Sequence, residues 1–343
     1  MDSIVLYTEE IDDLEEAAEE LFSQMEGFSL KKNSMAILYT EEDTEYGELY
    51  DILKEKWDFP VIGCTAMAVL QGKEGYCQIG ISVMILTADD CTFTAGITDE
   101  INLTNYKSEI PSKYEELKKP HEEDINLVIS YGGMVTNDTH VAGDELVATL
   151  GEVSGGVPVY GASASDGLSF NGFKVFYNDV VTTNGQAIAL ISGNIDPKFV
   201  VINSIENRAS FSYEITKSDS NTIQRLGTGT FLGEVPEGAI LNIGIINRDD
   251  VQKSVNEAFD RTFKYLEEAD GKYKTLLCNS CAARFLALAS NTSAEAKTYQ
   301  GRLPEDVSLL GIYAYGEYCP VAGNVTKKEY NMFHNFTFTI MIL

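Results

Sequence analysis

Short apolar runs recur along the chain in an order that predicts a mixed α/β fold. Met35–Tyr39, Ile125–Ser130 and Thr275–Cys278 are apolar runs of strand length. Each precedes a second apolar run that contains a glycine, and a further strand-like run follows at 79–86, 187–191 and 335–343. Alternation with period two predicts half-buried strands, whereas apolar residues three and four apart predict the helices between them.

The glycine-containing runs share one signature: two apolar residues, Gly, any residue, a hydroxyl residue and Ala. Its copies are centred on Gly63, Gly161 and Gly311, and the spacing from Leu127 to Gly161 equals that from Leu277 to Gly311. We interpret the pattern as three divergent β-α-β-loop-β units. Each glycine is expected to lie at the C-terminal end of a strand, where a missing Cβ lets the backbone turn, and the three following loops are expected to converge.

The remaining pattern predicts how these units are completed. The runs at 171–177 and 187–191 are expected to pair through a turn at 182–185, and those at 199–205 and 209–215 to pair with each other. A helix is predicted over 251–266, capped by Asp249 or Asp250. The polar stretch Thr216–Asn221 predicts a boundary between domains 1–219 and 220–343. The expected fold class is α/β, with mixed β-sheets flanked by helices in two domains.

Composition narrows the class of protein. With 44% hydrophobic, 23% charged and 10% aromatic residues in 343, the chain is expected to be globular. Its net charge of −28 repels phosphate backbones and anionic headgroups, which argues against nucleic-acid and membrane partners. No apolar run approaches the roughly 18 residues of a membrane span, and the acidic N-terminus has no secretory apolar region. The expected location is the cytoplasm, with all six cysteines free.

Polar side chains near the glycines are candidates for a binding site. Ser163 and Asp166 follow the second glycine, where they either contact a ligand or simply form a turn. Arg284 comes directly after an apolar run, and its planar fork suits a carboxylate ligand or an internal ion pair with Glu317 or Asp166. Tyr315 and Glu317 follow the third glycine. If Arg284 and a carboxylate face one pocket, together they suit the two ends of an α-amino acid.

The cysteine and histidine residues suggest two alternatives to a simple binding site. Cys281 and His334 could pair as nucleophile and base, with Asn335 beside them, in a hydrolase or amidase. The pair Cys278 and Cys281 has no second pair or following histidine, so the ligand set for a metal is incomplete. Non-covalent haem needs only one axial ligand, so a single His among the three in the chain would be enough.

The same residues resemble a known family. The run 159–166 resembles the glycine-rich signature of the FIST N domain. In the second half, Cys281–Arg284, Gly311–Glu317 and His334–Thr337 follow the order of the FIST C domain motifs. The segment 220–233 is shorter than the one the family usually has there. The resemblance implies a bacterial intracellular signal-input protein that binds a small ligand, for which amino acids have been proposed; some members are haem-binding nitric-oxide sensors.

We therefore expect a cytoplasmic small-ligand sensor without catalysis of its own and without a cofactor. The ligand is expected to be an amino acid or similar small carboxylate, and the output to pass through a separate partner such as a histidine kinase or chemoreceptor. The alternatives are the cysteine hydrolase and a haem-based gas sensor. The expected ligand-binding residues are Ser163, Asp166, Cys281, Arg284, Tyr315, Glu317, His334 and Asn335.

Overall fold

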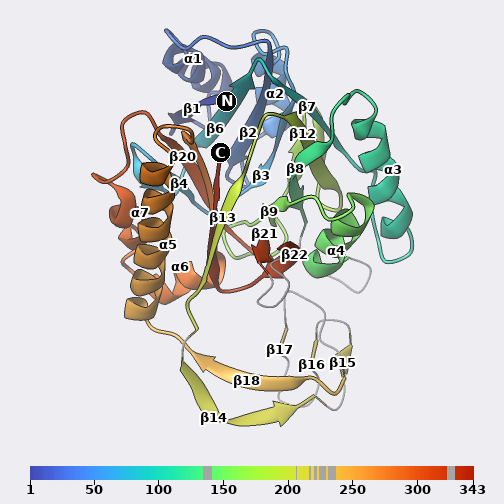
Figure 1. The fold of residues 1–343 in the computed structure, drawn as a ribbon, viewed down its shortest axis with the longest axis vertical. Coiled ribbons are helices and arrows are strands. Elements are labelled where there is room, and N and C mark those ends of the chain that lie inside the picture. The colour runs from blue at the N-terminus through green and yellow to red at the C-terminus, as the bar shows by residue number, and fades with distance from the viewer. Residues whose placement is uncertain are drawn as a thin grey trace.

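Three mixed six-stranded sheets with helices on their outer faces form the body of the protein (Figure 1). The structure is a computed structural model that describes residues 1–343 apart from 134–140, 206, 216–217, 220–221, 224–228, 231–236 and 323–328. The α/β class with helix-flanked mixed sheets, predicted from periodicity, is confirmed.

The first two units have the same order of elements: strand, helix, strand, helix, strand, a hairpin and a final strand. The first unit comprises β1 (Asp2–Thr8), α1 (Leu14–Gln24), β2 (Asn33–Thr40), α2 (Tyr46–Leu53), β3 (Val61–Thr65), β4 (Val69–Gln71), β5 (Gly75–Cys77) and β6 (Ile81–Ala88). The second comprises β7 (Cys91–Ile97), α3 (Tyr106–Lys118), β8 (Ile125–Gly132), α4 (Gly143–Val153), β9 (Val159–Ser163), β10 (Val175–Tyr177), β11 (Val180–Thr182) and β12 (Gln186–Gly193).

The third unit repeats this order but carries an insertion after its first strand. Its repeated elements are β13 (Lys198–Asn203), α5 (Arg248–Glu268), β19 (Thr275–Cys281), α6 (Ala282–Leu288), α7 (Ala294–Tyr299), β20 (Ser308–Ala314), β21 (Glu317–Ala322), β22 (Glu329–His334) and β23 (Thr337–Ile342). The insertion holds β14 (Asn207–Glu214), β15 (Ser218–Asp219), β16 (Thr222–Ile223), β17 (Gly229–Thr230) and β18 (Ile240–Ile245).

The hairpin of each unit pairs with the sheet of another unit rather than with its own. Hairpin β4–β5 of the first unit extends the third unit's sheet at β20, and β10–β11 of the second extends the first at β3. Hairpin β21–β22 of the third unit extends the second unit's sheet at β9. The exchange is cyclic, so the three units interlock with pseudo-threefold symmetry. Strand pairing therefore crosses the predicted 219/220 boundary, which itself adjoins residues outside the described part of the chain and stays a prediction.

The three signature glycines occupy equivalent places, but not the expected ones. Gly63, Gly161 and Gly311 lie in the middle of β3, β9 and β20 rather than at strand ends. A Cβ built on Gly161 would lie 1.7 Å from the Ser130 carbonyl oxygen of the adjacent parallel strand, and one on Gly63 would lie 1.8 Å from that of Leu38. The glycine is thus required by close approach of two backbones, not by a turn.

Two predicted strand pairings and one predicted helix cap were wrong. Strand β12 pairs with β7 and β8 rather than with β10, whose hairpin partner is β11. Strand β13 pairs with β23, and β14 pairs with β18. Helix α5 begins after Asn247, which forms a capping box with Asp250. The strand-like run predicted at 335–343 contains β23, which is paired on both sides, with β13 and β19.

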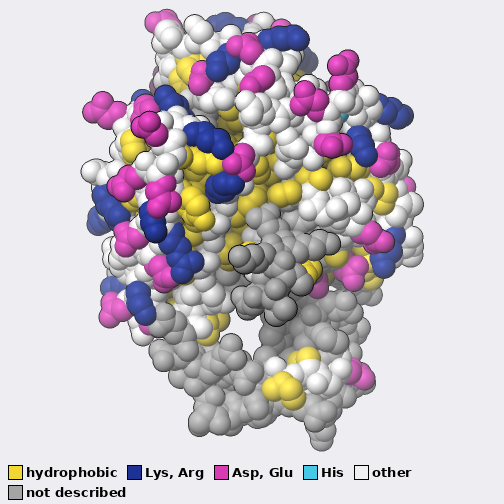
Figure 2. Space-filling model, viewed as in Figure 1, with side chains coloured by type: hydrophobic (Ala, Val, Ile, Leu, Met, Phe, Trp, Pro, Cys, Tyr) yellow, Lys and Arg dark blue, Asp and Glu magenta, His cyan; other side chains and the backbone are white. Residues whose placement is uncertain are grey.

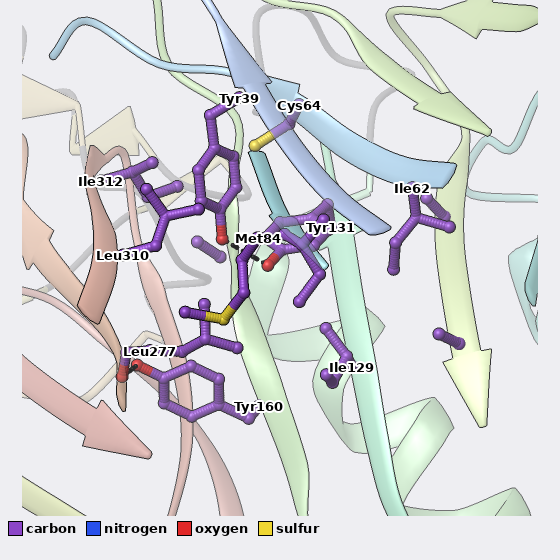
Figure 3. Packing of buried hydrophobic residues seen from close by; sticks show 14 of the residues in the cluster. Tyr39, Ile62, Cys64, Met84, Ile129, Tyr131, Tyr160, Leu277, Leu310 and Ile312 are labelled. Carbon is purple, nitrogen blue, oxygen red and sulfur yellow. Dashed lines mark hydrogen bonds between the residues drawn. The ribbon is translucent and has the colours of Figure 1, made fainter. Parts of the chain in front are cut away.

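The central core fills the space between the inner faces of the three sheets (Figure 3). Tyr39 and Tyr131 come from equivalent positions in β2 and β8, and their hydroxyls lie 2.5 Å apart. Tyr160 donates to the Leu277 carbonyl oxygen at 2.8 Å, so the buried phenols are satisfied by groups of other units. Acidic and basic side chains are interspersed over the face in Figure 2, with an apolar band across its middle. No helix in the described residues is long and apolar enough to cross a bilayer.

Candidate functional site

The loops that follow the three glycine strands meet one another, as predicted. The Ser165 amide donates to the Thr65 carbonyl oxygen at 3.0 Å, and the Tyr315 amide to that of Ser163 at 3.2 Å. The Tyr313 amide donates to the Ala68 carbonyl oxygen at 3.0 Å, which joins the first and third loops. The Ser165 hydroxyl bridges the same two, because it accepts from the Met67 amide at 3.0 Å and donates to the Tyr313 carbonyl oxygen at 2.5 Å. The loops therefore form a ring at one end of the core.

Asp166 organises the loop that leaves this ring. Its carboxylate accepts hydrogen bonds from the Tyr315 hydroxyl, from Ser169 and from the amides of residues 170–172. Burial opposes its ionisation, but these donors outweigh that cost and hold the pKa of Asp166 at about 2. Phe170 stacks on Tyr315 at 4.9 Å between ring centroids. Both carboxylate oxygens of Asp166 and the Tyr315 hydroxyl are thus engaged within the loop.

Glu317 is the ionisable group with the fewest hydrogen-bond partners among the predicted site residues that the structure describes. It is 0% exposed, and its Oε2 accepts from the Thr337 hydroxyl at 2.6 Å. The Cys281 thiol also interacts with the carboxyl, but a thiol is a weak donor, and Oε1 has no hydrogen-bond partner. Burial raises the pKa of Glu317 to about 8. Burial, and then the neighbouring Glu317, raises the pKa of Cys281 well above its usual range, so the thiol stays protonated.

The pseudo-threefold symmetry shows that this carboxyl is peculiar to one unit. In each sheet the residue that follows the signature glycine pairs with one residue of the imported hairpin. That hairpin residue is Val69 in one sheet, Val175 in the second and Glu317 in the third. Val69 and Val175 are both buried. The fold needs only an apolar side chain here, and the third unit carries a carboxyl instead.

Arg284 is fully engaged by groups other than Glu317. Its Nε and Nη2 donate to Oε1 of Glu295 at 3.0 and 2.6 Å, and neither side chain is exposed. Nη1 donates to the hydroxyls of Ser204 and Ser254. The alternative of an internal ion pair is the one seen, but with Glu295 as partner rather than Glu317 or Asp166. A direct contact between Arg284 and a ligand stays a prediction.

The other predicted residues lie around Glu317 with different exposure. His334 pairs with Glu317 across β21 and β22, and its Nε2 lies 2.9 Å from the Cys319 carbonyl oxygen. Burial lowers the pKa of His334, which favours the neutral ring. Asn335 is exposed. The next residue, Phe336, has φ +60°, a left-handed conformation that is costly for an aromatic side chain, and its amide interacts with Cys281.

The structure thus brings most of the predicted residues together, but in two groups. Cys281, Glu317 and His334 adjoin one another, and Ser163 joins them because its amide donates to the Gly316 carbonyl oxygen at 2.9 Å. Asp166 and Tyr315 form the second group, which the hydrogen bond from the Tyr315 amide to the Ser163 carbonyl oxygen joins to the first. Sequence reasoning missed Glu295, which lies in a polar run without a recognisable pattern. It also passed over Thr337, although that residue ends a motif already noted.

The predicted site residues do not line the cavity beside β1, and the described residues contain no cluster of metal ligands. A cavity of 550 Å³ is bounded by β1, the β4–β5 turn and residues 301–309, and it contains none of the predicted site residues. In the described part of the chain, no three His, Cys, Asp or Glu side chains gather as a metal site would require.

Comparisons with known proteins support the sequence resemblance. Residues 34–228 match the FIST N domain and residues 220–320 match the FIST C domain. FIST domains are associated with the sensing of small ligands in signal transduction. No curated protein matches the chain. Among solved structures, a chorismatase is 9% identical over 99% of this chain and 98% of its own, with a TM-score of 0.41, a likeness too low to carry an argument.

Proposed function

Because the chain belongs to the FIST family, we propose that it is a cytoplasmic sensor that binds an amino acid or a similar small carboxylate next to Glu317 and signals through a separate partner. A histidine kinase or a chemoreceptor is the kind of partner we have in mind. The proposal assigns no catalysis to the chain.

The observation that carries the proposal is the unpaired Oε1 of Glu317. A buried carboxyl with one unsatisfied oxygen costs the fold several kcal/mol unless a partner is supplied. Valine fills the same place in the other two units at no such cost. A ligand ammonium would satisfy that oxygen, and the resulting ion pair would also favour the ionised carboxylate.

Access to Glu317 requires a local opening, which suits a sensor. The carboxyl is fully buried and accepts from Thr337, which directly follows the turn that contains Asn335 and Phe336. Phe336 holds a left-handed backbone there that costs about 1–3 kcal/mol, and an opening of the turn that relaxes this residue would recover that cost. A ligand that binds only the open arrangement would shift the population toward it, which is how a binding protein produces a signal.

The cysteine-hydrolase alternative receives less support from the geometry. The immediate neighbour of the Cys281 thiol is a carboxyl, which raises the pKa of the thiol, whereas a nucleophile needs it lowered. The Nε2 atom of His334 is directed to the Cys319 carbonyl oxygen. Haem remains an alternative that reconstitution would test: a Soret band that disappears in His334→Ala would favour it.

A thermal-shift screen of the 20 proteinogenic amino acids tests the proposal directly. At about 100 times its Kd, a ligand stabilises the fold by roughly 2.7 kcal/mol, which raises Tm by several degrees. Glu317→Gln should abolish the shift, whereas Glu257→Gln, the same change in an exposed pair with Arg261, should keep it. A shift that persists in Glu317→Gln would place the ligand elsewhere, and turnover of an ester or amide lost in Cys281→Ser would favour the hydrolase.

A further inference from the structure

The insertion of the third unit departs from the pseudo-threefold plan at one defined place. In the first unit residues 9–13 join the first strand to its helix, and in the second unit residues 98–105 do so. In the third unit the same connection runs from 204 to 247 and carries the strand pair β14–β18 outside the three sheets (Figure 1). None of the three six-stranded sheets includes this strand pair.

Arg284 joins the two chain segments that lead into and out of the insertion. Ser204 directly follows β13, and Ser254 lies in the second turn of α5. Nη1 of Arg284 donates to both hydroxyls, which are 3.0 Å apart, and Nη2 lies 3.4 Å from the Val251 carbonyl oxygen. A buried guanidinium bonded to both segments fixes the base of the insertion as one rigid unit.

The same residue is linked to the proposed ligand site by a short helix. Cys281, which interacts with Glu317, precedes α6, and Arg284 lies in the first turn of that helix. Arg284 also acts on Glu317 through its charge. A ligand that changes the charge or position of Glu317 therefore acts on Cys281 and, through α6, on the guanidinium.

We propose that Arg284 couples occupancy of the Glu317 site to the base of the β14–β18 strand pair, and that this strand pair is the output element of the sensor. The inference rests on the proposed function, since it assumes a ligand at Glu317. Arg284 is a positioning residue in this scheme: it stays paired with Glu295 while its bonds to Ser204 and Ser254 are made or broken. A two-stranded ribbon is marginally stable alone, so loosening its base changes its order.

Hydrogen exchange of the full chain, followed by mass spectrometry, tests the connection without any ligand. Ser204→Ala with Ser254→Ala removes the hydroxyls at the base and leaves the Arg284–Glu295 pair intact. We expect amides of β14 and β18 to exchange at least tenfold faster in this variant, with β2 and β8 unchanged. Ser280→Ala is the control, because it removes a bond to Arg284 Nε at 3.2 Å that does not involve the insertion. Unchanged exchange in the double variant, or an equal rise in the control, would overturn the proposal.

A second arm uses a pool of the 20 proteinogenic amino acids as the probe. If the pool raises the Tm of the wild type, exchange in β14 and β18 should change at least threefold, and the double variant should keep the Tm shift but lose the change in exchange. A Tm shift without any change in exchange would disprove the coupling and leave the proposed function standing. Absence of a Tm shift would contradict the proposed function itself.

Discussion

Glu317 carries a carboxyl where the two equivalent positions carry valine, and the effect of that carboxyl on stability can be measured. Its pKa of about 8 lies well above the 4.5 of an exposed glutamate because burial disfavours the charged form. A group whose pKa is raised on folding contributes stability below its unfolded pKa, and this contribution is lost as the pH rises through the folded value. Glu317 therefore destabilises the fold progressively between about pH 4.5 and 8.

Glu317→Gln should remove this dependence. We expect the free energy of unfolding of the variant, relative to the wild type, to rise by roughly 1 kcal/mol per pH unit between pH 5 and 8 and then level off. Urea denaturation at several pH values measures it, with Glu257→Gln as the exposed control. A constant difference across that range would mean that Glu317 is already ionised in the folded protein.

The pair of Arg284 and Glu295 gives a second test on single residues. Arg284→Met leaves the Glu295 carboxylate buried without its partner and should cost about 3–5 kcal/mol of unfolding free energy. Arg284→Met combined with Glu295→Met removes both charges and should recover much of that loss. Chemical denaturation of the two single variants and the double one yields the coupling energy. Simple additivity would contradict a direct ion pair.

Residue types alone left Arg284 with either a carboxylate ligand or an internal ion pair. They named Glu317 or Asp166 rather than Glu295 as the partner in that pair. Glu295 lies only eleven residues further along the chain, in α7, and nothing in its surroundings distinguishes it from the 52 other acidic residues. The choice among carboxylates is made by tertiary packing, which a single sequence does not display.

At the scale of the elements, periodicity predicted most helices and strands but not which strands pair. Each element can be predicted from local sequence, because apolar residues recur every two residues in a strand and every three to four residues in a helix. Pairing here is long-range: β21 joins β9, and β4 joins β20. The glycine signature correctly indicated three repeated units, but the glycines were wrongly expected at strand ends. Gly161 is required by its close approach to Ser130 on the neighbouring strand, and the local sequence pattern does not reveal that neighbour.

This close approach predicts that replacing glycine with alanine lowers the stability of the fold by different amounts at different positions. Gly161→Ala, and likewise Gly63→Ala, should lose at least 3 kcal/mol or fail to fold, because the new Cβ would overlap a backbone carbonyl oxygen. Gly47→Ala is the control: it lies in α2 with nothing within 4 Å of a Cβ, and alanine is favoured in a helix by roughly 0.5–1 kcal/mol. Thermal unfolding ranks the variants, and a mild effect at Gly161 would show that the strands can separate.

At the scale of the whole molecule, the three interlocked sheets should fold without the insertion. Replacing residues 206–245 with a short loop, equal in length to the 9–13 connection of the first unit, leaves every strand of the three sheets in place. We expect a folded protein whose Tm lies within a few degrees of the full chain and which keeps any ligand-induced shift. Circular dichroism and calorimetry would show it.

The end of the chain should behave in the opposite way. Deleting 338–343 removes most of β23, which lies between β13 and β19, and exposes apolar side chains whose burial contributes roughly 1.5–3 kcal/mol each. Soluble expression should be lost. If the shorter insertion variant unfolds while this truncated chain melts normally, the pseudo-threefold description of the body is wrong.

The number of ligands bound per chain tests the central claim most directly. Three equivalent positions exist, but only one carries a carboxyl, so native mass spectrometry with the amino acid that gives the largest thermal shift should show one ligand per chain. Glu317→Gln should bind none at the same concentration. Three ligands per chain, or one ligand that binds Glu317→Gln as tightly as the wild type, would contradict a sensor built around Glu317.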